Sequence, residues 1–429
     1  MKKRATPETD PGVEKDRLIS KDYLLIIVSN LGVTCMNQFF LAVTPLFIEL
    51  LGGAQLQTGM MTAAFAIAAM AARPVSGVLS DKFGRVRQMI IGTFLCAVVC
   101  AVFGFIGVFP VLLVLRAING ASFGMHSTSA GAAVADVIPT SRLAEGIGYY
   151  GLISTISLSV APGIALYVVR GNTMPDFRTL FLITSALCFA GTIISCCITY
   201  ERKKKKAASL EAGYNASISG GAVGADAIDR SASLPKAFLG FEYAVFAPAL
   251  VVILVYAGQT GILAFMALFA RSKGIDNPAM YYIINGAGIF VSRVFFGRVV
   301  DRRGPDVVII PAMSLLCVCL ILFPFVDSLV MLAAIGFPIG LSIGSIVTTL
   351  SALVFKRSSA ARRGTASGAY FGAIDLSWAI STPLLGAVAD AFGYEVMYRV
   401  GAAAVLSALI VYLLLCSEKH YNAKRLKEG

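Results

Sequence analysis

Charged residues are scarce in this sequence of 429 residues. Asp, Glu, Lys and Arg together make up 14% of the chain, whereas hydrophobic residues make up 57%. A soluble domain carries about 25% charged residues, because its surface must be solvated. The low charge therefore excludes an ordinary soluble protein and favours a chain that lies mostly in lipid.

Several catalytic signals are also missing or rare. The chain has two histidines and no Gly-x-x-x-x-Gly-Lys-Ser/Thr sequence, so ATP hydrolysis is not supported as an energy source. Its nine cysteines fall in or beside apolar runs rather than in loops at ligand spacing. This placement indicates helix packing, not a metal site. We therefore expect no enzyme activity and no cofactor.

Long apolar runs fill most of the sequence. A helix needs about 20 apolar residues to cross a bilayer. The runs are too long and too uniform for the alternating strands of a membrane barrel. We predict an all-α membrane protein with twelve transmembrane helices. The predicted spans are 23–50, 57–79, 88–107, 110–133, 144–169, 178–200, 243–270, 278–299, 307–326, 328–355, 364–389 and 394–416.

Basic residues gather in alternate loops. They precede the first span, as in Lys2-Lys3-Arg4, and follow the even-numbered spans, as in the run from Arg202 to Lys206. The positive-inside rule places these loops and both termini in the cytoplasm. We predict a multi-pass protein of the cytoplasmic (inner) membrane. The excess of basic charge is then topological, so we expect no binding to nucleic acid.

One polar stretch divides the chain. Residues 201–240 begin with a basic run and are rich in Ala, Gly and Ser, which predicts a flexible cytosolic linker. The linker separates an N-terminal six-helix bundle at 23–200 from a C-terminal bundle at 241–416. Residues 1–22 and 417–429 are predicted to be cytosolic tails.

The two halves repeat each other. A shift of 220 residues superimposes unusual features of the first half on the second. The matched pairs are Arg73 and Arg293, Gly77 and Gly297, Asp81 and Asp301, Gly84 and Gly304, Gly120 and Gly340, Tyr150 and Tyr370, and, after one inserted residue, Gly151 and Gly372, and Pro162 and Pro383. Repeats of this kind place a substrate site between the halves of many secondary transporters.

The loop after the second span resembles a family signature. It reads Gly77-Val-Leu-Ser-Asp81-Lys-Phe-Gly84-Arg85-Val-Arg87, and it recurs in part as Gly297-Arg-Val-Val-Asp301-Arg-Arg-Gly304. This spacing resembles the signature loop of the major facilitator superfamily, and the whole chain looks similar to its bacterial drug and sugar efflux permeases. The resemblance implies two pseudo-symmetric six-helix bundles that work by alternating access, and we expect a monomer.

The resemblance also implies a conformational latch. In the family, the Asp and Arg of the signature loop form a charge cluster with an acid at the cytosolic end of the fourth helix. The matching positions are Gly77, Asp81, Gly84, Arg85 and Asp136, with Gly297, Asp301 and Gly304 in the second copy. Pro305-Asp306 replaces the basic pair in the second copy, so we expect a weaker latch there.

Three ionisable residues inside spans are candidates for proton coupling. Asp375 lies about halfway along the eleventh span, where a carboxyl group binds a proton readily. Arg116 lies in Arg116-Ala-Ile-Asn-Gly120, which looks like the family's fourth-helix motif for proton coupling. A charge in lipid is costly, so Arg116 should face the cavity and have a partner, for which Asp375 is the candidate. His126, near the same helix face, is a candidate relay. The alternatives are a static ion pair and a packing histidine.

Other polar residues within spans are candidates to line the substrate cavity, because they would be costly toward lipid. They are Asn30, Asn37, Gln38, Gln259 and Trp378. For Trp378, lipid-facing or core packing is an equal alternative. In the fifth span, Ser159-Val-Ala161-Pro162-Gly163 resembles a degraded antiporter motif, and Pro162 and Pro383 are predicted to bend their helices.

The sequence therefore predicts a secondary transporter that moves a small molecule through the bilayer, with a proton gradient as its energy source. Efflux of an amphiphilic compound or metabolite is the favoured direction. Proton symport for uptake of a small metabolite is the alternative, because the antiporter motif is degraded. A non-transporting membrane sensor or an embedded enzyme is a remote alternative.

Overall fold

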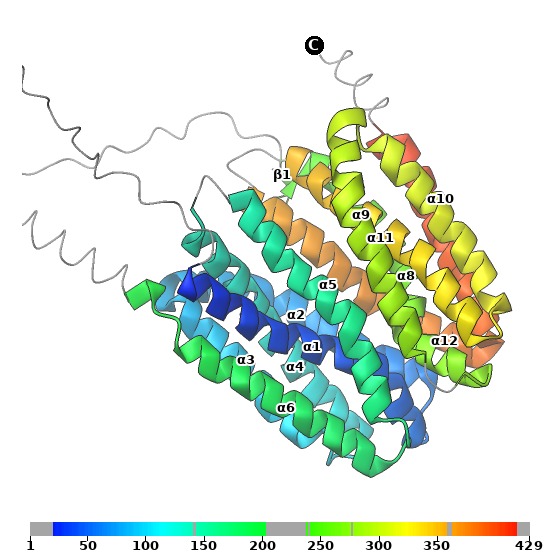
Figure 1. Ribbon diagram of the computed structural model, residues 1–429, viewed down its shortest axis with the longest axis horizontal. Coiled ribbons are helices and arrows are strands. Elements are labelled where there is room, and N and C mark those ends of the chain that lie inside the picture. Colours follow the sequence, from blue (N-terminus) through cyan, green and yellow to red (C-terminus); the bar gives the residue numbers. More distant parts are fainter. Residues whose placement is uncertain are drawn as a thin grey trace, which may run out of the picture.

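A bundle of long helices forms almost the whole described part of the protein (Figure 1). The computed structural model describes residues 20–139, 143–202, 237–238, 241–275, 278–357 and 363–417. The helices are α1 (Lys21–Leu50), α2 (Gln55–Phe83), α3 (Arg85–Phe103), α4 (Phe109–Val137), α5 (Leu143–Val168), α6 (Met174–Cys196), α8 (Tyr243–Ser272), α9 (Ala279–Arg303), α10 (Asp306–Leu322), α11 (Leu329–Arg357) and α12 (Arg363–Val411). The predicted helical membrane fold is confirmed.

The twelve predicted spans all fall on these helices. Ten helices of the described residues are long and apolar enough to cross a membrane. The last of these contains two of the predicted spans, because α12 is interrupted at Gly393, where the backbone takes a φ of 83°. The remaining span is α4, which has 29 residues and carries Arg116, His126 and Asp136 along its length.

Two glycines make the sharp reversals at the signature loops. Gly84, between α2 and α3, has a φ of 99°, and Gly304, between α9 and α10, has a φ of 84°. Residues with a side chain rarely adopt this region of backbone space. Both copies of the loop therefore make their tight turn in the same way, with a glycine at positive φ.

The internal repeat is visible in the closest helix contacts. A Cβ atom on Gly120 of α4 would overlap the backbone of Phe65 in α2, and a Cβ atom on Gly340 of α11 would overlap the backbone of Asn285 in α9. Phe65 and Asn285 are themselves 220 residues apart. Small residues let helices approach closely in membranes, and here each half uses them at the same pair of positions.

The helices gather as two groups that meet along a seam (Figure 1). Helices α1 to α6 contact one another, as do α8 to α12. Across the seam α2 packs against α12, α5 against α9, and α1 against α8. The α2–α12 and α5–α9 contacts are related by the repeat, since each joins the second helix of one half to the fifth helix of the other.

The linker region differs from the prediction at both of its edges. Residues 200–202 are helical, so the first half continues past residue 200. On the other side, β1 (Ala237–Phe238) pairs antiparallel with β2 (Phe241–Glu242), just before α8. Residues 203–236 lie outside the described residues, as do residues 1–19 and 418–429 of the predicted tails at 1–22 and 417–429.

Candidate functional site

An ion pair joins the two halves across the seam. The Nε of Arg73, on α2, donates to Oδ2 of Asp375, on α12, at 2.7 Å. The side chains are only 20% and 14% exposed. Because Arg73 is the repeat partner of Arg293, it belongs to the internal symmetry, whereas Asp375 has Ser154 as its counterpart in the first half. The ion pair is therefore a feature of one side of the seam only.

Arg73 also contacts two further groups that fix its orientation. Its Nη1 donates to the hydroxyl of Ser127 on α4 at 3.2 Å. Its guanidinium carbon lies 5.7 Å from the ring centre of Phe371, one turn before Asp375 on α12. Arg73 thus ties α2 and α4 of the first half to α12 of the second.

The repeat-related arginine crosses the seam in the opposite direction. Nη1 of Arg293, on α9, donates to the backbone carbonyl of Gly151, on α5, at 3.1 Å. In each half, therefore, an arginine on the second helix contacts the fifth helix of the other half. One of them meets a carboxylate and the other meets a peptide oxygen.

Arg116 does not pair with Asp375, so the predicted partnership is wrong in this structure. Arg116 is 2% exposed and donates from Nη1 to Oδ1 of Asn119, one turn along α4, at 2.6 Å. Its guanidinium lies between the rings of Phe40 and Phe65, with the ring centres 4.6 and 4.2 Å from its central carbon. Cation–π contacts within the first half thus replace the expected carboxylate.

His126 is fully buried in the first half. Its Cβ lies 3.0 Å from the position that a Cβ on Gly92 of α3 would occupy, so this histidine faces α3. No hydrogen bond among the described residues links His126 to Arg116 or Asp375. A relay between these three groups would need a different arrangement of the helices.

The cavity candidates are mainly buried polar groups. Asn30, Asn37 and Gln259 are buried, and Gln38 and Trp378 are partly buried. Among the described residues, Oδ1 of Asn37, Oε1 of Gln38, Oε1 of Gln259 and Nε1 of Trp378 are buried and have no hydrogen-bond partner. Unsatisfied buried polar atoms are uncommon in folded proteins, and here they lie on α1, α8 and α12, which all reach the seam.

The two predicted helix-bending prolines lie inside α5 and α12 and close to the seam. A Cβ atom on Gly59 of α2 would be 2.5 Å from Cα of Pro383. In the repeat-related place, a Cβ atom on Gly163, next to Pro162, would be 3.4 Å from Cβ of Ala279 on α9. The prolines therefore mark matching contacts between the halves.

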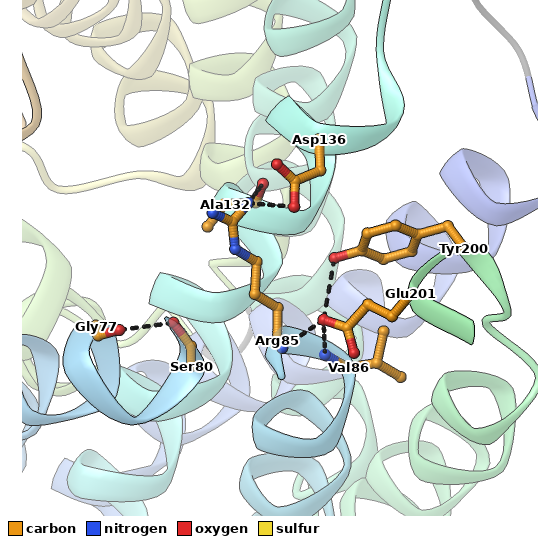
Figure 2. Close-up of polar contacts among 8 residues, drawn as sticks. All are labelled: Gly77, Ser80, Arg85, Val86, Ala132, Asp136, Tyr200 and Glu201. Atoms are coloured by element: carbon orange, nitrogen blue, oxygen red, sulfur yellow. Dashed lines mark hydrogen bonds and ion pairs between the residues drawn. The ribbon is translucent and has the colours of Figure 1, made fainter. Parts of the chain in front are cut away.

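Two residues of the first copy of the predicted latch, Arg85 and Asp136, contact each other within the first half (Figure 2). Nη1 of Arg85 lies 2.5 Å from Oδ2 of Asp136, at the end of α4, and also donates to the carbonyl of Ala132 at 2.6 Å. The expected Arg85–Asp136 pair is therefore present. The side chains of Asp81 and, in the second copy, of Asp301 lie outside the described residues, and the surroundings of Gly297 are not described.

Glu201 belongs to the same cluster, although the sequence placed it in the linker. Its Oε1 accepts hydrogen bonds from the backbone N–H of Arg85 at 2.5 Å and of Val86 at 3.2 Å, at the start of α3 (Figure 2). Tyr200 donates to the same oxygen at 3.4 Å. An acid directly after a predicted span, on the same side of the membrane as the glycine turn, is the signal that could have found it.

Further polar contacts cross the seam at the opposite end of α2, which we call the α1–α2 end. The carboxylate of Asp390, on α12, accepts from the backbone N–H of Gln55 at 2.9 Å and of Leu56 at 2.8 Å. Arg271, at the end of α8, lies 3.2 Å from Glu49, at the end of α1. At the α2–α3 end, by contrast, the contacts of Arg85 with Asp136 and of Glu201 with Arg85 and Val86 lie within the first half.

The described residues hold no group of three or more His, Cys, Asp or Glu placed to bind a metal ion. The chemistry that the seam shows is charge pairing, between a guanidinium of one helix bundle and a carboxylate of the other. Such an arrangement suits a change of conformation that depends on charge, rather than covalent catalysis.

Several known proteins are similar to this chain in sequence or in fold. An uncharacterised MFS-type transporter, MJ1560, from Methanocaldococcus jannaschii is 23% identical over 92% of this chain and 98% of its own length. The quinolone resistance protein NorA of Staphylococcus aureus is 29% identical over 39% of this chain and 42% of its own length. The crystal structure of a mutant of the nucleoside transporter NupG superimposes with a TM-score of 0.72, at 12% identity, over 92% of this chain and 100% of that one.

The family assignment follows from a match that spans nearly the whole chain. Residues 24–382 and 249–429 both match the description of the Major Facilitator Superfamily. The two matches overlap because the chain contains two similar halves. The protein is a multi-pass membrane transporter, not an enzyme, and it belongs to the major facilitator superfamily.

Proposed function

We propose that this protein exports an amphiphilic compound or metabolite in exchange for protons, and that Asp375 carries the exchanged proton. The observation that carries the proposal is the Arg73–Asp375 ion pair across the seam. Removing one charge of a buried pair leaves the other uncompensated, at a cost of about 3–5 kcal/mol. Protonation of Asp375 would neutralise its carboxylate and so weaken the ion pair that joins the two halves at the seam. No covalent bond or backbone contact would have to break.

The coupling follows from a shared equilibrium. With Asp375 ionised, Arg73 holds α2 and α12 together; with Asp375 neutral, the two helices separate more easily. A ligand that binds better to one of these arrangements shifts the same equilibrium as the proton does. Proton and substrate can then drive each other without direct contact.

We also propose an orientation for the structure. The basic loops place the α2–α3 end and both termini in the cytoplasm of a bacterial-type inner membrane. The contacts of Asp390 and of Arg271 with Glu49 would then close the outer side. This distribution favours an arrangement that faces the cytoplasm, with the substrate site between 23–200 and 241–416.

The proposed direction of transport rests on a partial similarity to one resistance protein. The partial similarity to a quinolone resistance protein supports export. Proton symport for uptake remains the second candidate, because the sequence around Pro162 lacks two glycines of the antiporter motif. Within this motif, the side chain of Ser159 packs closely against Gly286 of α9. A glycine at position 159 would leave more room between the two helices.

Proteoliposomes with an imposed pH gradient test the proposal. We expect the wild-type protein to move protons when a transported compound is added, and Asp375→Asn to transport without moving protons. Arg399→Gln, which changes an exposed charge, serves as the control. Unchanged proton movement in Asp375→Asn would overturn the role of this carboxylate, and the direction of proton movement would separate antiport from symport.

A further inference from the structure

Arg293 is a partly buried cation at the seam, and among the described residues no Asp or Glu forms an ion pair with it. We propose that it binds the carboxylate group of the transported compound. The inference rests on the proposed transport function and adds to it the chemical class of the substrate. A guanidinium remains charged at all physiological pH values and binds carboxylates through paired hydrogen bonds.

The repeat shows what is missing around Arg293. Its counterpart Arg73 meets the carboxylate of Asp375, but the residue that corresponds to Asp375 on the other side of the seam is Ser154. Arg293 instead donates from Nη1 to the carbonyl of Gly151. Among the described residues, no Asp or Glu forms an ion pair with it.

One hydrogen-bond donor of the Arg293 guanidinium has no acceptor among the described residues. Its Nε is buried and has no hydrogen-bond partner among the described residues. A charge inside a membrane protein is expensive and usually marks a substrate or ion path. A carboxylate that accepts from this Nε would satisfy the donor and neutralise the charge in one contact.

Two tyrosines complete a polar site around the arginine. Tyr256, on α8, and Tyr370, on α12, both interact electrostatically with Arg293. Tyr370 also donates to the carbonyl of Val347 at 3.2 Å. Phenol groups supply both a hydrogen-bond donor and a flat apolar surface, which suits a carboxylate attached to an apolar body.

The net charge favours a carboxylate over a phosphate. One guanidinium balances one negative charge, whereas a phosphate ester carries a charge of about −1.5 to −2 at neutral pH. Arg73 is already paired with Asp375 and Arg116 is enclosed in the first half. A single carboxylate therefore matches the charge that this site leaves open.

A purely structural role for Arg293 makes a different prediction. If its bond to Gly151 served only to hold α5 against α9, replacing Arg293 would alter stability but would not change any preference between charged and neutral ligands. The test must therefore compare ligands of the same shape and different charge.

Binding of benzoate and of its neutral isostere benzamide to the purified protein in detergent makes this comparison, with inorganic phosphate as a third probe. We expect benzoate to bind more tightly than benzamide or phosphate. In Arg293→Gln we expect benzoate to bind about tenfold more weakly or worse, because a hydrogen bond to a charged group is lost. Binding of benzamide should not change.

Arg293→Lys keeps the charge and should retain part of the preference for benzoate over benzamide. If Arg293→Gln does not fold, the comparison is made with Arg293→Lys instead. Arg399→Gln removes an exposed positive charge and should leave binding unchanged. Equal binding of benzoate and benzamide, or tighter binding of phosphate, would overturn the assignment. Because binding is measured without a gradient, its outcome is independent of proton coupling at Asp375.

Discussion

Asp390 of α12 caps the first turn of α2 through the backbone N–H of Gln55, so one half of the protein completes a helix of the other. The position before α2 is Ala54, whose side chain cannot cap the helix. The free N–H groups at the start of a helix favour a carboxylate, both as an acceptor and as a negative charge. The cap would therefore be lost if the two halves separated at the α1–α2 end.

We predict that Asp390→Ala shifts the protein toward an arrangement that is open at the α1–α2 end. A lost cap costs about 0.5–2 kcal/mol, which corresponds to a change of about 2-fold to 30-fold in the ratio of closed to open forms. Spin labels on α1 and α8 at this end, with distances measured by pulsed EPR, report the ratio.

Asp176→Ala is the matched control for this experiment. Asp176 accepts from the backbone N–H of Thr173 at 3.1 Å and so caps α6 from within its own half. Its loss should lower stability without changing the distance across the seam. An equal effect of both substitutions on the labels would show that the Asp390 contact has no role in closure.

Glu201 is expected to stabilise the first half by joining residues 200–202, which follow α6, to the start of α3. In Glu201→Ala the backbone N–H groups of Arg85 and Val86 lose their acceptor. We predict a loss of about 1–2 kcal/mol, seen as a lower midpoint of thermal unfolding in detergent. Glu395→Ala should change the midpoint much less, because its 3.6 Å pair with Lys273 is largely exposed.

The α4–α2 contact should be sensitive to a single methyl group. A Cβ atom on Gly120 would overlap the backbone of Phe65, whereas a Cβ atom on Gly131, further along the same helix, would meet nothing within 4 Å. We predict that Gly120→Ala destabilises the protein by about 1–3 kcal/mol, while Gly131→Ala is neutral or slightly stabilising. Thermal unfolding of the two variants checks this, and similar midpoints would contradict the close helix contact.

Much of the fold could be predicted because its physical causes are local or repeated. Long apolar runs require helices, and Gly84 and Gly304 mark the reversals at the same place in each half. The shift of 220 residues also relates matching contacts in the structure. Gly120 packs against Phe65 in the first half, and Gly340 packs against Asn285 at the equivalent place in the second. The Arg85–Asp136 pair followed from the family resemblance.

The partner of Asp375 could not be predicted, because the arginine that it meets lies 302 positions away. Arg116 and Arg73 are both arginines within spans, and sequence spacing does not tell which of them faces the seam. Aromatic rings that surround Arg116 satisfy it without a carboxylate. Glu201 was missed for a related reason, since a charge after the last apolar residue looks like the start of a linker.

A double-mutant cycle tests whether Arg73 and Asp375 act as a unit. Arg73→Gln and Asp375→Asn each remove one partner of the 2.7 Å pair, so each should destabilise the protein, and the double variant should lose less than the sum of the two. Residues in direct contact show interaction energies of about 0.5–3 kcal/mol. Thermal unfolding of the four proteins in detergent measures the coupling.

The repeat supplies the control for this cycle. Arg293→Gln combined with Asp375→Asn should be nearly additive, because Arg293 bonds to Gly151 and not to Asp375. If the Arg293 pair coupled as strongly as the Arg73 pair, the seam would act as one charge network rather than as two separate contacts. If the Arg73 pair were additive, the ion pair would contribute nothing to the conformation that the proton is proposed to control.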